Sequence, residues 1–205
     1  MFGKVTWILV AAYAVSLVVT MLPQTVERVA GLSLVFVFLF LVQWRAYRWV
    51  GRMRAAACLD GLTGLHNFAY FEKALQREMA ASLRTRQRLS LVMIDLDSFK
   101  QYNDRYGHVA GNNVLRELGK LLRSCIREGV DVAARFGGDE FALLLPGVDE
   151  RTATRIVERL REKVAGRFDR VSISAGIQEY RGESLLKFLE RVDALMYREK
   201  KEGTR

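Results

Sequence analysis

The chain has 205 residues, of which 50% are hydrophobic and 27% are charged, a composition typical of a folded protein with at most one sizeable core. Its two cysteines, Cys58 and Cys125, are far apart and exclude a disulfide framework. The net charge of +9 is uneven, with +1 in residues 1–44, +4 in residues 45–58 and +4 in residues 59–205, so a nucleic-acid partner is not expected.

Residues 1–44 are predicted to form a membrane hairpin with spans at about 5–22 and 29–44. The first span contains no charged residue and reaches the minimum length for a helix that crosses a hydrocarbon core of about 30 Å. The second apolar run is shorter, but the aromatic residues that follow it extend it into the interface. A cleaved signal peptide, with Lys4 as its positive end, is the alternative for the first run. The second run, which follows almost at once, favours the hairpin.

Residues 45–58 are predicted to form a basic juxtamembrane linker helix. They contain four arginines and no acidic residue, and positive charge beside a span favours the cytoplasmic side. We therefore expect a multi-pass protein of the inner (cytoplasmic) membrane, in contact with the lipid bilayer, whose residues 59–205 lie in the cytoplasm. The linker helix would be either a dimerising stalk or only a solvated connection, because one or two heptads do not establish a coiled coil.

Residues 59–205 alternate between strand-like and helix-like patterns, which predicts an α+β domain with a sheet of about five strands and helices on one face. Strands are expected at Leu89–Leu96, Val132–Phe136, Phe141–Pro146 and Val171–Ile177. Helices are expected at Asn112–Ile126, Asp149–Val164 and Ser184–Lys200. Gly137 and Gly138 are a two-residue hairpin signal, and Asp149 or Thr152 is the N-cap candidate of the second helix.

Acidic residues lie at the ends of neighbouring predicted strands. Asp95 and Asp97 end the first hydrophobic strand, and Asp139 and Glu140 lie in the hairpin between the next two. A carboxylate that ends a buried strand is costly unless it is paired or binds a cation. Two such clusters are the minimal ligand set for Mg²⁺ in two-metal nucleotidyl transfer. The alternative is that these acids are ordinary polar strand ends and turn residues.

Four blocks, in the right order, resemble the GGDEF family of diguanylate cyclases. The signature is RFGGDEF at Arg135–Phe141. The opening block DGLTGLHN and the block DLDSFKQYNDRYGHVAGNNVL are similar to family motifs, and VDALMYREKKEG at Val192–Gly203 resembles the closing A-D-x-A-L-Y-x-A-K-x-x-G. The resemblance covers residues 59–205. It implies an α+β, palm-like and ferredoxin-like nucleotidyl-cyclase domain, which the two predicted transmembrane helices would precede.

The resemblance also implies an enzyme of bacterial signalling that works as a homodimer. Each subunit binds one GTP, and each 3′-hydroxyl attacks the partner's α-phosphate, giving cyclic di-GMP and two pyrophosphates. Two Mg²⁺ or Mn²⁺ ions are expected in each active site. By the same resemblance, Asp95 binds metal through its carboxylate and Leu96 through its backbone carbonyl. Asp139 completes the metal set and helps to deprotonate the hydroxyl, and Glu140 supports the same site.

The residues that the resemblance assigns to GTP lie in three of the blocks. They are Phe99, Lys100, Asn103, Asn112, Gly137, Gly138 and Lys200. The two glycines suit a turn where the backbone approaches the nucleotide. Phe99 and Lys100, in the turn after the metal-binding strand, would lie along the phosphates, with Lys200 as a second cationic partner. Asn103 would read the guanine edge.

Asn112 departs from the family pattern, which usually has Asp at this position. An amide presents one acceptor and one donor, so one guanine contact is lost, at a cost of roughly 1–3 kcal/mol. The same pair of groups matches adenine. GTP remains the expected substrate because Asn103 is present, and a cyclase that takes ATP in place of one or both GTP molecules is the alternative.

A second departure lies before the signature. The family often has an inhibitory R-x-x-D site for the product, but residues 128–131 read EGVD, and Arg127 is displaced by one position. We therefore expect the product-inhibition site to be absent and inhibition to be weak or lacking. A third hypothesis is a catalytically idle domain that binds nucleotide and acts as a receptor or scaffold.

Overall fold

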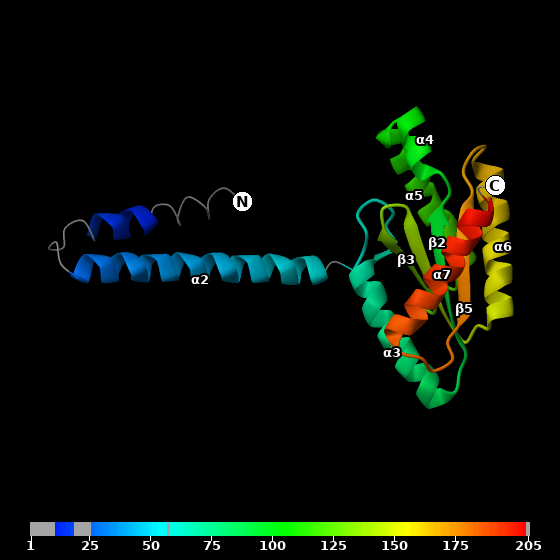
Figure 1. Cartoon of the computed structure of the whole chain (residues 1–205), viewed down its shortest axis with the longest axis horizontal. Helices are drawn as coiled ribbons and strands as arrows, with labels where there is room; N and C mark the ends of the chain where they lie inside the picture. The colour runs from blue at the N-terminus through cyan, green and yellow to red at the C-terminus, as the bar shows by residue number, and fades with distance from the viewer. Residues whose placement is uncertain (1–10, 19–25, 57, 204–205) are drawn as a thin grey trace. The chain divides into compact units, whose positions relative to one another are not determined.

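The structure is a computed structural model of the chain, and it describes residues 11–18, 26–56 and 58–203. The chain divides into two compact units, Met1–Ala56 and Ala57–Arg205 (Figure 1). In the first unit, residues 11–18 are helical and helix α2 runs from Val26 to Ala56 without a break. The absence of proline from α2 permits this continuity. The apolar run expected as the second span and the basic linker are thus parts of one helix.

The two expected transmembrane helices are not found. In the stretches that the structure describes, no helix combines the length and the apolar character that a membrane crossing requires. Of the predicted span 5–22, the structure describes residues 11–18, which are helical, and the remainder lies outside the described residues. The predicted span 29–44 belongs to α2, in which the apolar run is followed by an arginine-rich sequence.

The second unit contains one five-stranded sheet with the strand order β1-β3-β4-β2-β5, as an α+β domain predicts. The strands are β1 (His66–Asn67), β2 (Leu89–Leu96), β3 (Val132–Gly137), β4 (Glu140–Pro146) and β5 (Ile173–Glu179). The short strand β1 pairs with β3 in parallel, and the other neighbouring strands are antiparallel. All eight residues of β2 are buried, because it lies between β4 and β5.

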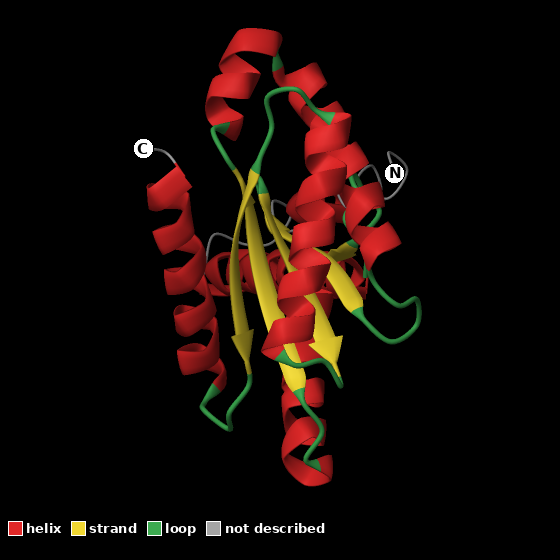
Figure 2. Ribbon diagram, turned by 90° about the vertical axis from the view of Figure 1, so that its right-hand side faces the viewer, coloured by secondary structure: helices red, strands yellow, loops and turns green. Residues whose placement is uncertain are grey.

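Helices cover both faces of the sheet, so the expectation that they lie on one face is wrong (Figure 2). The helices are α3 (Phe68–Thr85), α4 (Phe99–Tyr106), α5 (His108–Cys125), α6 (Glu150–Arg167) and α7 (Leu185–Gly203). Val92 and Ile94 of β2 pack in one hydrophobic cluster with α5 and α6, and Leu91 and Met93 pack in the other with α3 and α7. Successive side chains of a strand point to opposite faces, and here both sets are apolar.

Most predicted elements of this unit are present with shifted ends. Of the two N-cap candidates for α6, Asp149 is the N-cap, and its side chain accepts a hydrogen bond of 2.8 Å from the Thr152 amide. Helix α5 begins four residues earlier than predicted, and β5 begins and ends two residues later. The hairpin turn is formed by Gly138 and Asp139 rather than by Gly137 and Gly138. The helices α3 and α4 were not expected from the periodicity.

Candidate active site

Three acidic residues predicted for the site come together where β2 ends and β4 begins. Asp95 stands opposite Glu140 in the antiparallel pairing of these strands. The Leu96 amide donates a hydrogen bond of 3.4 Å to the backbone carbonyl of Asp139. Only 6% of Asp95 is exposed, whereas Asp139 and Glu140 are half-buried. Strand register therefore joins acids that are more than 40 positions apart in the sequence.

Lys200 of α7 reaches into this cluster. Its Nζ donates a hydrogen bond of 2.5 Å to Oδ1 of Asp95. Burial raises the pKa of Asp95, and the charges of Asp139 and Asp97 raise it further against the opposing effect of Lys200. Burial alone would lower the pKa of Lys200, but the Asp95 carboxylate, with Asp139 and Asp97, holds it above its ordinary value. The ammonium group is thus the cation that the crowded carboxylates share.

The pKa of Glu140 is also raised by its surroundings. Burial raises its pKa, and the carboxylates of Asp95, Asp139 and Asp193 add to the effect, while Lys200 opposes it. Within the residues that the structure describes, no group of three or more His, Cys, Asp or Glu side chains is arranged to hold a metal ion. The donor set still fits a hard divalent cation, because such a cation takes carboxylate oxygens and would relieve the mutual repulsion.

Arg135 stabilises the turn at Gly138 and Asp139 through hydrogen bonds to its backbone. Its Nε and Nη2 donate hydrogen bonds of 3.0 and 2.6 Å to the carbonyl of Gly138, and its Nη1 lies 3.3 Å from Oδ1 of Asp60. Gly138 has φ of +47°, a conformation that favours glycine. The Asp60 carboxylate also accepts from the amide and the hydroxyl of Thr63 at 2.9 and 2.7 Å. The opening motif and the signature are therefore joined by one polar network.

A second part of the site lies where α4 meets α5. The expectation that Phe99 and Lys100 lie in a turn is wrong, because they are the first two residues of α4. Lys100 is exposed. Oδ1 of Asn103 is buried and accepts no hydrogen bond from the part of the chain that the structure describes. A Cβ on Gly111 of α5 would lie 1.8 Å from that oxygen and 3.1 Å from Cζ of Phe99. A buried acceptor without a donor fits a ligand that supplies an N–H group.

Two of the remaining predicted residues are exposed to solvent. Asn112 is exposed on α5, and Gly137, the last residue of β3, is also exposed. Asp97, the second acid at the end of β2, accepts hydrogen bonds of 2.6 Å from the hydroxyls of Ser172 and Ser174. These serines are more than 70 positions away, so no local pattern could have revealed that Asp97 is engaged in this way.

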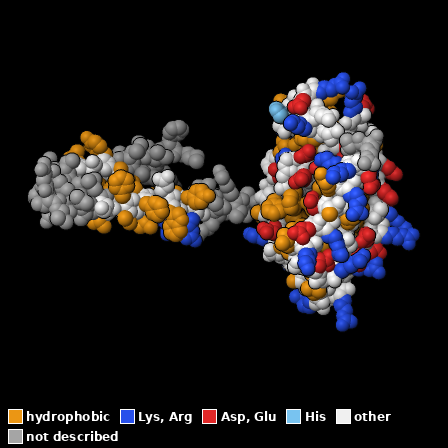
Figure 3. All heavy atoms as spheres, viewed as in Figure 1, with side chains coloured by type: hydrophobic (Ala, Val, Ile, Leu, Met, Phe, Trp, Pro, Cys, Tyr) orange, Lys and Arg blue, Asp and Glu red, His pale blue; other side chains and the backbone are white. Residues whose placement is uncertain are grey.

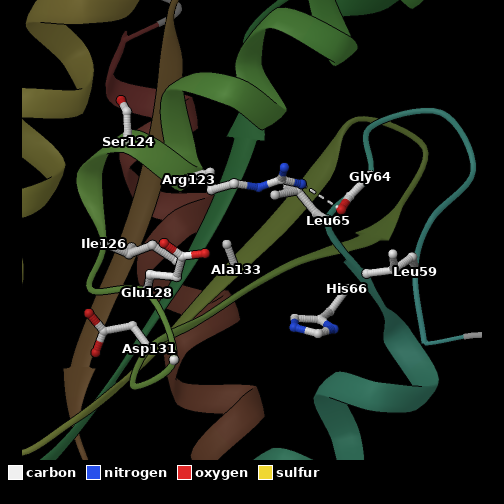
Figure 4. A pocket seen from close by; sticks show the side chains of 11 residues that line it. Leu59, Gly64, Leu65, His66, Arg123, Ser124, Ile126, Glu128, Asp131 and Ala133 are labelled. Atoms are coloured by element: carbon white, nitrogen blue, oxygen red, sulfur yellow. Dashed lines mark hydrogen bonds between the residues drawn. The ribbon is translucent and has the colours of Figure 1, made fainter.

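The cavity in Figure 4 is separate from the cluster of Asp95, Asp139 and Glu140, because none of these residues lines it. It has a volume of about 580 Å³ and is lined by Leu59, Gly64, Leu65, His66, Arg123, Ser124, Ile126, Glu128, Gly129, Asp131 and Ala133. Arg123 crosses it to donate a hydrogen bond of 2.6 Å to the Gly64 carbonyl. The Asp131 side chain is 1% exposed and is bound by Arg127, whose Nη2 and Nε lie 2.6 and 3.1 Å from its two oxygens.

Comparison with known proteins gives one consistent result. Residues 57–205 match the family described as diguanylate cyclase, GGDEF domain. The diguanylate cyclase DgcM of Escherichia coli K12 is 38% identical over 157 residues, which are 74% of this chain and 38% of that protein. The chain thus spans well under half the length of this relative.

Two solved structures have the same fold. The diguanylate cyclase SiaD of Pseudomonas aeruginosa, solved with its activator SiaC, gives a TM-score of 0.68 at 33% identity and covers 86% of this chain and 71% of its own. The GGDEF domain of DgcB from Caulobacter crescentus, solved with c-di-GMP, gives a TM-score of 0.68 at 30% identity and covers 72% and 89%.

Proposed function

The chain belongs to the GGDEF-domain diguanylate cyclase family, and we propose that it condenses two GTP molecules into cyclic di-GMP and two pyrophosphates. The observation that carries the proposal is the cluster of Asp95, Asp139 and Glu140 around Lys200 at the ends of β2 and β4. Such a cluster offers oxygen ligands and a cationic group to a triphosphate. A domain that had lost its chemistry would have no physical need to keep like charges crowded in a half-buried site.

The reaction requires two nucleotides facing each other. O3′ of one GTP forms a bond to the α-phosphorus of the other, and the bond from that phosphorus to the bridging oxygen breaks, so that pyrophosphate leaves. The hydroxyl proton passes to the carboxylate of Asp139, and a second, equivalent step closes the ring. Divalent ions, when bound by Asp95, Asp139 and the Leu96 carbonyl, would neutralise phosphate charge. Lys200 lies beside the same carboxylates and would contact the triphosphate.

The nucleotide base would lie against α4 and α5. The unpartnered Oδ1 of Asn103 supports this, since a guanine N–H would satisfy it. One domain offers one such place, so the reaction needs a second copy of the chain. A homodimer is therefore part of the proposal.

The first test is an incubation of the purified full chain with Mg²⁺ and GTP, ATP or both, followed by identification of the products by mass. We expect cyclic di-GMP from GTP, and none from an Asp139→Ala variant that unfolds at the same temperature as the wild type. If Asp139→Ala makes cyclic di-GMP at the wild-type rate, the proposed role of Asp139 in the reaction is wrong. A mixed or adenine-containing product would assign a different base choice, which the exposed Asn112 motivates.

We also propose weak product inhibition. Glu128 stands where the inhibitory arginine would be, and Asp131 is buried and held by Arg127. An acid at the first position repels a phosphate. Both oxygens of Asp131 already accept hydrogen bonds from Arg127 and the side chain is 1% exposed, so a guanine would have to displace Arg127 to reach it. Initial rates measured with added cyclic di-GMP are expected to stay constant well above the product level reached in the assay. Inhibition at low product concentration would contradict this.

Attachment of the N-terminal unit to the inner membrane, with the catalytic unit in the cytoplasm, is a further part of the proposal. It is supported by exposed apolar side chains on α2, which Figure 3 shows in orange. They include Leu34, Phe36, Phe38, Phe40 and Trp44, each at least 50% exposed. Flotation with lipid vesicles is the measurement. We expect the full chain to float with the vesicles and residues 57–205 to remain behind, and the opposite result for the full chain would exclude attachment.

A further inference from the structure

We propose that Glu199 is a positioning residue that aims Lys200 at Asp95, an inference that rests on the proposed cyclase function. Neither the signature nor the opening block contains it. In the closing pattern A-D-x-A-L-Y-x-A-K, alignment on Asp193 and Lys200 places Ala at the position that Glu199 occupies here. Alanine has no atom beyond Cβ, so the contacts described below depend on this chain's own residue.

Helix α7 lies unusually close to the outer strand β5. A Cβ on Gly176 would stand 2.0 Å from the backbone carbonyl of Val192 and 2.6 Å from the amide of Met196. The absence of a side chain at Gly176 therefore lets the two backbones approach. This contact fixes the middle of α7, whereas Lys200 lies one helical turn beyond it.

Glu199 ties that next turn to the edge of the sheet. Its Oε2 accepts a hydrogen bond of 2.7 Å from the amide of Ala175 in β5. Because β5 is an outer strand, this amide is directed away from β2 and would otherwise need water. Its other oxygen accepts a hydrogen bond from Nη2 of Arg161 in α6. Both side chains of this ion pair are 39% exposed.

The Arg161–Glu199 pair joins helices on opposite faces of the sheet. Helix α6 packs in the cluster on one face and α7 in the cluster on the other, so the pair passes around the edge at β5. Nε of Arg161 is buried and has no hydrogen-bond partner among the described residues. The guanidinium of Arg161 thus has one unsatisfied donor, and among the described residues it forms an ion pair with Glu199.

Two adjacent residues at the end of α7 are therefore fixed in different directions. Glu199 is held at the edge of β5, and Lys200 reaches Asp95 on the neighbouring strand β2. Successive residues of a helix differ in direction by about 100°. Fixing one of them sets the rotation of the turn and, with it, the direction of the other. Glu199 acts on the carboxylate cluster through Lys200 and does not touch it.

The test is a double-mutant cycle in the full chain. Glu199→Ala is expected to lower kcat/KM for GTP by roughly ten- to a hundredfold, because a misplacement of about 1 Å can cost on the order of a hundredfold. In a Lys200→Ala background the same change should have no further effect. The matched control is Glu202→Ala, which removes an exposed glutamate from the same helix and should leave kcat/KM unchanged. Equal losses from Glu199→Ala in both backgrounds, or no loss in either, would overturn the proposal.

A second readout does not depend on activity. In crystal structures of the variants, the contact between Lys200 Nζ and Asp95 should be lost in Glu199→Ala and kept in Glu202→Ala. If it is kept in Glu199→Ala, the proposal is wrong whatever the enzyme does. If the wild type makes no product from GTP while the contact behaves as expected, the cyclase function fails and the positioning role of Glu199 stands.

Discussion

Crowding of like charges at the ends of β2 and β4 has a measurable cost at the level of single residues. The pKa of Glu140 is raised in the folded chain, by burial first and then by Asp95 and Asp139. A carboxyl group with a raised pKa destabilises the fold as the pH rises from its ordinary value of 4.5 through the raised one. Below that window both the folded and the unfolded chain hold the proton, and the effect vanishes.

Glu140→Gln should therefore stabilise the protein in the absence of divalent ions. We expect its Tm to exceed that of the wild type at pH 7, and the difference to shrink as the pH falls towards 4. Thermal unfolding of the full chain across this pH range is the measurement. Glu202→Gln, which changes an exposed glutamate, should show no such trend, and a Tm for Glu140→Gln below the wild-type value at pH 7 would count against the crowding.

Asn112 is expected to limit the affinity for GTP. Asn112→Asp restores a carboxylate that can accept from two adjacent guanine donors, which should lower KM for GTP by about tenfold, the equivalent of 1.4 kcal/mol. Affinity for ATP should not improve. The neighbouring Asn113→Asp is the matched control, because Asn113 is exposed on the same helix and already accepts a hydrogen bond from Arg116. Equal gains for the two nucleotides would show that the effect is general.

The sequence predicted some residues of the candidate site, and it could not have predicted others. Asp95 ends a buried strand and Asp139 and Glu140 lie in a hairpin, so antiparallel pairing suffices to bring them together. The role of Glu199 depends on the rotation of a helix against an edge strand, which no motif encodes. The orphan oxygen of Asn103 likewise depends on the approach of Gly111 from another helix.

At the level of elements, the sequence predicted β2 to the residue and β3, β4 and β5 to within about two residues, because continuous apolar runs mark buried strands. The two-residue strand β1 was not predicted. The sequence failed on the number of helical layers. Helix α3 has buried residues at helical spacing, including Phe71, Leu75 and Met79, but the sheet residues in the same hydrophobic cluster come from three different strands, β2, β3 and β4. Periodicity within one segment shows that a face is buried and does not show which face of the sheet it covers.

The close approach of α7 to β5 predicts a strong effect of a single methyl group. Gly176→Ala would place Cβ 2.0 Å from a backbone carbonyl, and neither backbone is a flexible side chain that could yield. We expect a loss of about 2–3 kcal/mol in the free energy of unfolding, within the range for overpacked cores. Urea unfolding is the measurement. Gly166→Ala on α6, where a Cβ would meet nothing within 4 Å, is the control. Equal stabilities of the two variants would contradict the packing described.

For the whole molecule, both hydrophobic clusters lie inside the unit Ala57–Arg205. The fragment 57–205 should therefore unfold cooperatively and fold without the N-terminal helices. The proposed reaction joins nucleotides held by two copies of the chain, so the activity of the fragment per molecule should fall as it is diluted, and more steeply than that of the full chain on vesicles. Calorimetry and rates over a range of concentrations test both points. A fragment without a cooperative transition, or with activity independent of concentration, would contradict this view.

The two outer strands of the sheet bear on aggregation. Exposed strand edges act as templates for strand addition, and very short or covered edges do not. The outer strand β1 has only two residues, and the Ala175 amide on the outer strand β5 is occupied by Glu199. The Glu179 amide of β5 likewise donates to a side chain, that of Glu150, so a strand that added to this edge would have to displace both glutamates.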